Sequence, residues 1–214
     1  MNSRAFSPLA IIVAAILVGF TTYAQAGPPL TCHRIDIGQA TSLPPIDWNQ
    51  KDTGGYNLKN LTRDTLGILD SSTSVLVRME TLRRATIYAR HDPQIAKELL
   101  MRLHARTADS HSGSYSESLA WFDAGYLAEA YKQWMGNAVY NPAAGIDGYV
   151  WVKKAISLRG EDPEMEFAAA LITLRGPESA HREHARKAIA GAKTDPLLAQ
   201  NLSSEFHDVI VSEL

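Results

Sequence analysis

Apolar residues recur every three or four positions through most of the chain after residue 55. Two runs show this spacing clearly: Leu58, Leu61, Thr65, Ile68 and Leu69, and then Val75, Met79, Leu82, Thr86 and Ala89. This period is that of an α-helix with one buried face. No stretch shows the period of two that a half-buried strand requires. The pattern therefore predicts an all-α protein.

A short motif recurs three times with the same internal spacing. It consists of two basic residues and an alanine, followed seven residues later by an Asp-Pro pair. The copies are Arg83-Arg84-Ala85 before Asp92-Pro93, Lys153-Lys154-Ala155 before Asp162-Pro163, and Arg186-Lys187-Ala188 before Asp195-Pro196. The Asp-Pro pairs lie 70 and 33 residues apart, so the first interval is close to two of the second. This regularity indicates an internal repeat.

Each copy of the motif predicts a pair of antiparallel helices. The aspartate caps the second helix, and the proline occupies its first position, where a missing N–H costs nothing. The two basic residues are expected in the last turn of the first helix, at the negative end of its dipole. Residues three and seven positions after each aspartate should face the preceding helix: Ile95 and Leu99, Met165 and Ala169, Leu198 and Leu202. Such pairs stack on one another, and we expect about seven to eight helices.

The second copy carries a resemblance to known repeat families. Its residues are Tyr149, Trp151, Lys154-Ala155-Ile156, Gly160, Asp162-Pro163-Glu164, Phe167 and Ala170-Leu171. With a period near 33 residues, this stretch resembles the tetratricopeptide and Sel1-like repeats. It departs from them in lacking the Leu-Gly pair and the downstream tyrosine of the first helix, and the unit before it has no Asp-Pro pair. The resemblance implies an α-solenoid of stacked helix pairs and a role in binding other proteins.

Aromatic residues gather in the unit that lacks the Asp-Pro pair. Nine of the 17 aromatic residues lie between Tyr115 and Trp151, and the predicted helix 116–135 is apolar on nearly every side. A helix of this kind is usually buried between its neighbours. The alternative is that some of its aromatic residues reach a groove beside the loop Gly136–Gly148 and anchor a partner there. The candidates for this binding surface are Trp121, Tyr126, Tyr131, Trp134 and Tyr140.

The other candidate chemistry is a pair of histidines. His181 and His184 share a helix face with Glu178, and two imidazoles and a carboxylate are a possible zinc ligand set. The His-Glu-x-x-His spacing is absent, and Arg182 and Arg186 add positive charge, which favours an ordinary polar surface. A small helical enzyme or metal-binding protein that uses this face remains the alternative function. Because no P-loop, dinucleotide fingerprint or serine elbow is present, we expect no cofactor and consider an enzyme less expected than a binding protein.

The amino terminus has the anatomy of a secretory signal peptide. Arg4 precedes an apolar run from Leu9 to Phe20, and Ala24-Gln25-Ala26 has the small-x-small pattern that signal peptidases cleave. We therefore expect a signal peptide at 1–26, an extended lead at 27–55 and a helical-repeat domain at 56–214.

The expected product is an exported protein, periplasmic or secreted, with no membrane span once the signal is removed. The net charge of −2 gives no reason to expect nucleic-acid binding. The expected partner is another protein or a component of the cell envelope. The single cysteine, Cys32, cannot form an internal disulfide. The lead is expected to attach to the helical domain through a buried Trp48.

Export predicts a defined amino terminus for the mature protein. Because the cleavage pattern ends at Ala26, protein recovered from its native host should begin at Gly27. Amino-terminal sequencing measures this directly. A chain that keeps Met1 and stays in the cytoplasm would contradict the export prediction.

Overall fold

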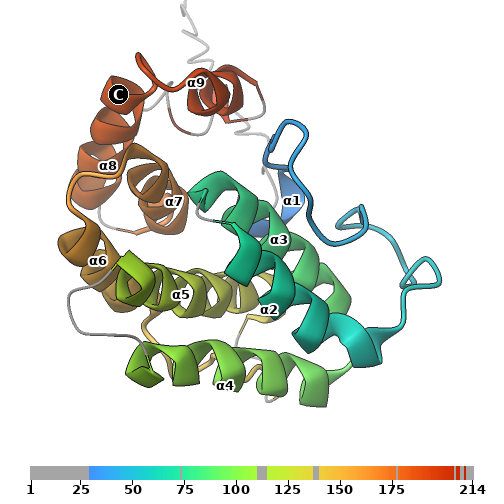
Figure 1. Cartoon of the computed structure of the whole chain (residues 1–214). Helices are drawn as coiled ribbons and strands as arrows, with labels where there is room; N and C mark the ends of the chain where they lie inside the picture. The colour runs from blue at the N-terminus through green and yellow to red at the C-terminus, as the bar shows by residue number, and fades with distance from the viewer. Residues whose placement is uncertain are drawn as a thin grey trace, which may run out of the picture.

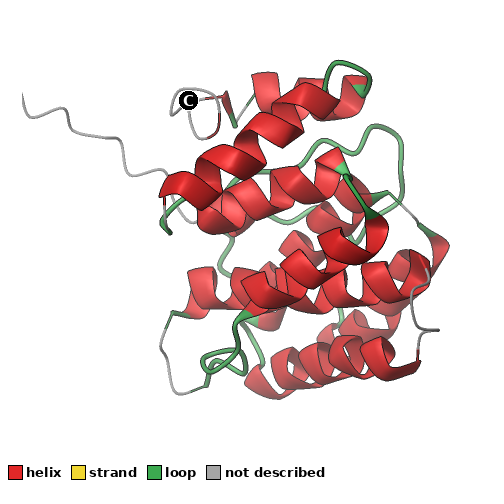
Figure 2. Cartoon of the chain, turned by 90° about the vertical axis from the view of Figure 1, so that its left-hand side faces the viewer, coloured by secondary structure: helices red, strands yellow, loops and turns green. Residues whose placement is uncertain are grey.

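The structure, a computed structural model, describes residues 29–72, 74–109, 115–136, 140–176, 178–204, 206–207 and 210. Within these residues the fold consists of helices joined by loops, without a strand (Figure 2). The helices are α1 (Pro29–Cys32), the 3₁₀ helix η1 (Leu58–Asn60), α2 (Leu61–Ser71), α3 (Val75–Ala89), α4 (Pro93–Asp109), α5 (Tyr115–Met135), α6 (Gly148–Arg159), α7 (Pro163–Thr173), α8 (Glu178–Gly191) and α9 (Pro196–Ser203). The predicted all-α class is confirmed. No helix in this part of the chain is long and apolar enough to cross a membrane.

Each Asp-Pro pair begins a helix, as predicted. In all three cases one carboxylate oxygen accepts hydrogen bonds from the backbone amides two and three residues further on, at 2.9 to 3.3 Å, and the proline is the first helical residue. The helices that begin in this way are α4 at Asp92, α7 at Asp162 and α9 at Asp195. The cap is a local interaction, which is why the sequence alone identifies it.

The predicted position of the basic pairs is wrong. They lie in the middle of their helices, because α3 continues to Ala89, α6 to Arg159 and α8 to Gly191. Their side chains extend sideways to neighbouring groups instead of towards the carboxyl ends of their helices. The contacts are Arg84 with Glu80 at 2.6 Å, Lys154 with the ring of Trp121 at 3.9 Å, and Lys187 with Glu166 at 3.3 Å.

Helix α5 is the centre of the structure. It contacts α1, α3, α4, α6 and α7, and in Figure 1 it runs through the middle of the molecule with α4 below it. Its residues Phe122, Tyr126 and Tyr131 are fully buried, so the expectation of a central core helix is confirmed. The most extensive helix pairs are α5–α6 and α7–α8, and α3 contacts α7 as well as α5.

Two glycines allow α5 and α6 to approach closely. A methyl group added at Gly125 would lie 2.6 Å from the carbonyl oxygen of Gly148, which is shorter than any normal contact. The backbones of the two helices therefore touch at this point. Because Gly148 is the first residue of α6, the approach fixes where α6 begins relative to α5.

The lead is bound to α3 by buried charges. Arg83 forms two hydrogen bonds with the carboxylate of Glu80, at 2.7 and 2.9 Å, and donates to the backbone carbonyls of Thr31 and Ile46 at 3.1 and 3.3 Å. Glu80 also accepts a hydrogen bond from the amide of Ile35 at 3.0 Å. Both charged side chains are almost completely buried. The lead therefore supplies hydrogen-bond partners that α3 requires.

Trp48 does not attach the lead in the predicted way. Its side chain is 45% exposed, and its backbone carbonyl accepts a hydrogen bond from Arg90 at 2.8 Å. The apolar contribution of the lead comes from smaller side chains, since Leu30, Leu43 and Ile46 are buried. An aromatic residue in a loop was therefore a weaker indication of burial than the aliphatic residues around it.

Replacing Gly125 with alanine should destabilise the protein by about 1–3 kcal/mol. The new methyl group would clash with the backbone of α6, which can shift only if the packing of the two helices changes. Gly67→Ala in α2 is the matched control, since nothing lies within 4 Å of the added atom there. That change should stabilise the helix by about 0.5–1 kcal/mol. Urea denaturation followed by circular dichroism measures both. Equal effects of the two substitutions would contradict the close approach of α5 and α6.

Candidate functional site

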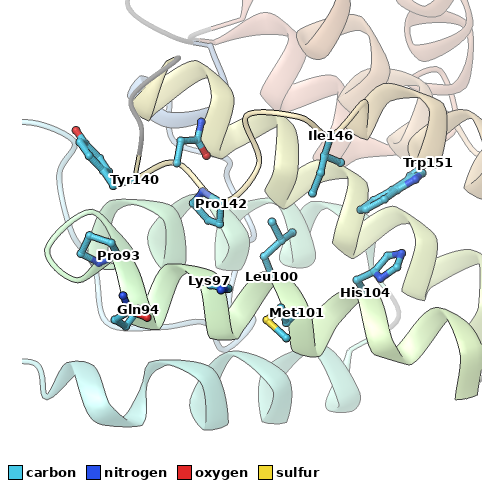
Figure 3. Close-up of a pocket in the computed structure, with 11 residues that line it drawn as sticks. Pro93, Gln94, Lys97, Leu100, Met101, His104, Tyr140, Pro142, Ile146 and Trp151 are labelled. Carbon is cyan, nitrogen blue, oxygen red and sulfur yellow. The ribbon is translucent and has the colours of Figure 1, made fainter.

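A groove with a volume of about 680 Å³ lies between α4 and the segment 140–146 that precedes α6 (Figure 3). We call it the α4 groove. Apolar and aromatic side chains form most of its lining, and four polar or basic ones complete it. The lining residues are Pro93, Gln94, Lys97, Leu100, Met101, His104, Tyr140, Asn141, Pro142, Ile146 and Trp151.

One stripe of α4 forms the floor of the groove. Gln94, Lys97, Met101 and His104 follow one another at intervals of three or four residues, so they share a helix face. Ten residues of helix span about 15 Å, which is the length of this stripe. Met101 is 61% exposed, an unusual position for a large apolar side chain.

The roof of the groove is held in place by hydrogen bonds to α5. The Asn141 side-chain amide donates to the carbonyl of Tyr131 in α5 at 3.4 Å and to that of Gly136, directly after α5, at 2.7 Å. Its oxygen accepts from the amide of Ala143, within the roof, at 2.9 Å. Further along, the Lys132 ammonium donates to the carbonyl of Ile146 at 3.0 Å. These contacts fix both ends of the segment 141–146, so the groove has a defined shape.

An aromatic cluster closes one end of the groove. The His104 ring stacks on Trp151 with centroids 4.7 Å apart, and Trp121 meets Trp151 edge-on at 6.0 Å. The Lys154 ammonium lies 3.9 Å from the centre of the Trp121 ring. This arrangement joins α4, α5 and α6 and presents part of the Trp151 ring to the groove.

Tyr140 lies at the opposite end, with Leu100, Pro142 and Ile146 between it and Trp151 (Figure 3). Its side chain is 57% exposed. Its hydroxyl has no hydrogen-bond partner among the described residues. The groove is therefore elongated, with an aromatic ring at each end and an apolar middle.

The five aromatic candidates from the sequence separate into three groups. Tyr140 is exposed in the groove, as expected. Trp121 and Trp134 are half-buried. Tyr126 and Tyr131 are fully buried in α5, and burial raises the pKa of both phenols. Placing those two tyrosines on a binding surface is therefore wrong, because both lie on faces of α5 that neighbouring parts of the fold cover.

Sequence reasoning missed the contribution of α4. Lys97, Met101 and His104 line the groove, yet their stripe resembles an ordinary polar helix face. One signal was available, since Met101 stands between Glu98 and Arg102 on the polar side of an otherwise amphipathic helix. Such a residue adds apolar area to an exposed helix face, and here that area is continuous with the lining of the groove.

The suggested metal ligands are not brought together. Glu178 is exposed and pairs with Arg182 at 3.0 Å. His181 is buried, with Nδ1 at 2.9 Å from the carbonyl oxygen of Ala170. Within the residues that the structure describes, no group of three His, Cys, Asp or Glu side chains has the arrangement of a metal site.

The second histidine belongs to a buried hydrogen-bond network. His184 Nδ1 lies 2.5 Å from a carboxylate oxygen of Glu166, and Nε2 lies 2.8 Å from the hydroxyl of Tyr149. Nδ1 is placed to donate to the ionised carboxylate, and Nε2 faces the tyrosine hydroxyl. Burial acts to raise the pKa of Glu166, but the hydrogen bond and charge of His184, together with Lys187, lower it further than burial raises it. The network thus links α6, α7 and α8.

Comparisons with protein-family models, with curated proteins and with solved structures each found no match.

Replacing Glu166 with glutamine should make stability less dependent on acidic pH. The pKa of Glu166 in the folded protein lies below the ordinary value of 4.5, so the ionised carboxylate stabilises the fold above that pH. The stability difference between wild type and Glu166→Gln should shrink as the pH falls from 4.5 through the folded-state pKa. Urea denaturation at a series of pH values measures this difference.

The matched control is Glu183→Gln, since Glu183 also pairs with Lys187 but is exposed. That variant should change stability little at any pH. A wild-type advantage over Glu166→Gln that persists or grows below pH 4.5 would show that the pKa of Glu166 is not lowered.

Proposed function

We propose that this chain is an exported binding protein and that the α4 groove docks an extended segment of a partner protein. The observation that carries the proposal is the elongated apolar groove, which has an exposed Tyr140 at one end, Trp151 at the other and an exposed Met101 on its floor. Exposed tyrosine and methionine side chains are typical of surfaces that bind other proteins. The anchored roof favours binding, because a preformed groove loses little conformational entropy on association.

The dimensions support a short peptide segment as the occupant. The stripe from Gln94 to His104 is about 15 Å long. An extended chain advances about 3.3 Å per residue, so the groove matches four to five residues. Successive side chains of such a segment would alternate between the floor of the groove and solvent.

The chemistry of the middle of the groove supports the same choice. Leu100, Pro142 and Ile146 offer apolar side chains there. A sugar would leave hydroxyl groups without hydrogen-bond partners against these residues, at a substantial energetic cost. Apolar peptide side chains carry no such cost.

The proposal extends to the location of the protein and to its repeat family. We propose that residues 1–26 direct export and that the helix pairs form a tetratricopeptide- or Sel1-like α-solenoid. The repeated caps at Asp92, Asp162 and Asp195 support the family assignment. Helical repeats of this class commonly bind other proteins across their concave surfaces, and an envelope component is the expected class of partner.

A random peptide library displayed on phage tests the docking site. Peptides selected on the wild-type protein should bind Tyr140→Ala about 5- to 30-fold more weakly, the usual effect of removing an aromatic anchor. The melting temperature should change little, because the Tyr140 side chain is largely exposed. Biolayer interferometry with immobilised synthetic peptides measures the affinities.

Trp48→Ala is the matched control, since Trp48 is also an exposed aromatic residue but lies outside the groove. Peptides that lose affinity for Trp48→Ala and keep full affinity for Tyr140→Ala would place docking elsewhere on the molecule. That result would overturn the proposed function.

A further inference from the structure

We infer that the segment bound in the α4 groove is acidic, with a carboxylate that pairs with Lys97 between apolar anchors. The inference rests on the proposed function, because it specifies the chemistry of the occupant of the same groove. It follows from the charges that line the groove, from the unpaired state of Lys97 and from the position of Lys97 along the floor.

The lining of the groove carries positive charge without a compensating acid. Its ionisable side chains are Lys97, His104 and Tyr140, and no aspartate or glutamate is among the lining residues. The whole chain, by contrast, has 23 acidic and 21 basic residues. The charge of the groove lining is thus positive, whereas the net charge of the whole chain is negative. Complementary charge favours an anionic partner.

Lys97 has no ion pair or hydrogen bond with any described residue. Arg106, further along the same helix, pairs with Asp70 and lies 3.7 Å from Asp123. Glu98, next to Lys97 in sequence, lines a neighbouring recess that Lys97 also borders, but it does not line the groove. No ion pair joins the two side chains within the described residues. The ammonium group of Lys97 is therefore available to an incoming carboxylate.

The position of Lys97 defines where the carboxylate would lie. Lys97 is one helical turn from Gln94 and one turn from Met101, so it occupies an inner position of the floor. The side-chain amide of Gln94 also has no hydrogen-bond partner among the described residues and can donate to the same carboxylate. Apolar residues on either side of the acid would then extend towards Tyr140 and towards Trp151.

The experiment uses immobilised pools of pentapeptides with acetylated and amidated ends. One position at a time is fixed as Glu, Gln or Lys, and the other positions are drawn from Ala, Ser, Leu, Phe and Trp. For at least one position, the wild-type protein should bind the Glu pool about two- to five-fold more tightly than the Gln pool, as an exposed ion pair predicts. The Lys pool should bind most weakly, and the preference for Glu should diminish at high salt.

Three variants assign the preference to Lys97. Lys97→Gln should remove the difference between the Glu and Gln pools, and Lys97→Glu should make the Lys pool bind more tightly than the Glu pool. Lys193→Gln is the matched control, because Lys193 is an exposed lysine outside the groove, and it should keep the wild-type preference. Circular dichroism melting verifies that each variant is folded.

The outcomes separate the inference from the proposed function. If wild type binds the Glu and Gln pools equally and Tyr140→Ala weakens both, the acidic preference is overturned and the docking groove stands. If Lys97→Gln weakens both pools alike, Lys97 contributes packing and no charge selection, which also overturns the inference. If Tyr140→Ala leaves the binding of every pool unchanged, both the inference and the proposed function are overturned.

Discussion

The structure depends on a buried ion pair between two residues of α3, Glu80 and Arg83. Both side chains are about 1% exposed, and charges in such a position are tolerated only when each donor and acceptor has a partner. The two side chains satisfy one another in part, and the lead provides the rest through the carbonyls of Thr31 and Ile46 and the amide of Ile35. The lead is therefore a structural component of the helical core. Removing Glu80 would leave Arg83 buried without its counter-ion, which is why this pair constrains everything packed around α3.

The groove follows from that core through a short series of contacts. α3 packs against α5, and the approach of Gly125 to Gly148 then sets the start of α6. This start places Trp151 in the first turn of α6, beside His104 of α4. The roof is fastened to α5 by Asn141 and Lys132. The groove is thus formed by helix packing and by partly buried hydrogen bonds at its edges.

The sequence predicts the features that depend on neighbouring residues. It does not predict the contacts that depend on how the helices pack. Helical periodicity and the three aspartate caps depend on a few neighbouring residues, so they are predicted correctly. The basic pairs were placed at helix ends, yet α3, α6 and α8 continue past them. Lys187 reaches Glu166 of α7, a partner that only the packing of α7 against α8 provides. Aromatic composition identified the correct region but could not separate buried Tyr126 from exposed Tyr140. In a helix that is apolar all round, periodicity does not say which residues the neighbouring helices cover.

The connection between α5 and α6 explains why the groove lies where it does. The connections that contain Asp-Pro pairs are short: three residues between α3 and α4, three between α6 and α7, and four between α8 and α9. The connection from α5 to α6 is 12 residues long and uses Asp147 as the cap of α6 without a proline. A short Asp-Pro turn holds two helices together and leaves no side chains to form a roof. Long connections in compact proteins commonly carry function. The long connection contains the segment 140–146, which forms the wall opposite α4 and so turns a helix face into a groove.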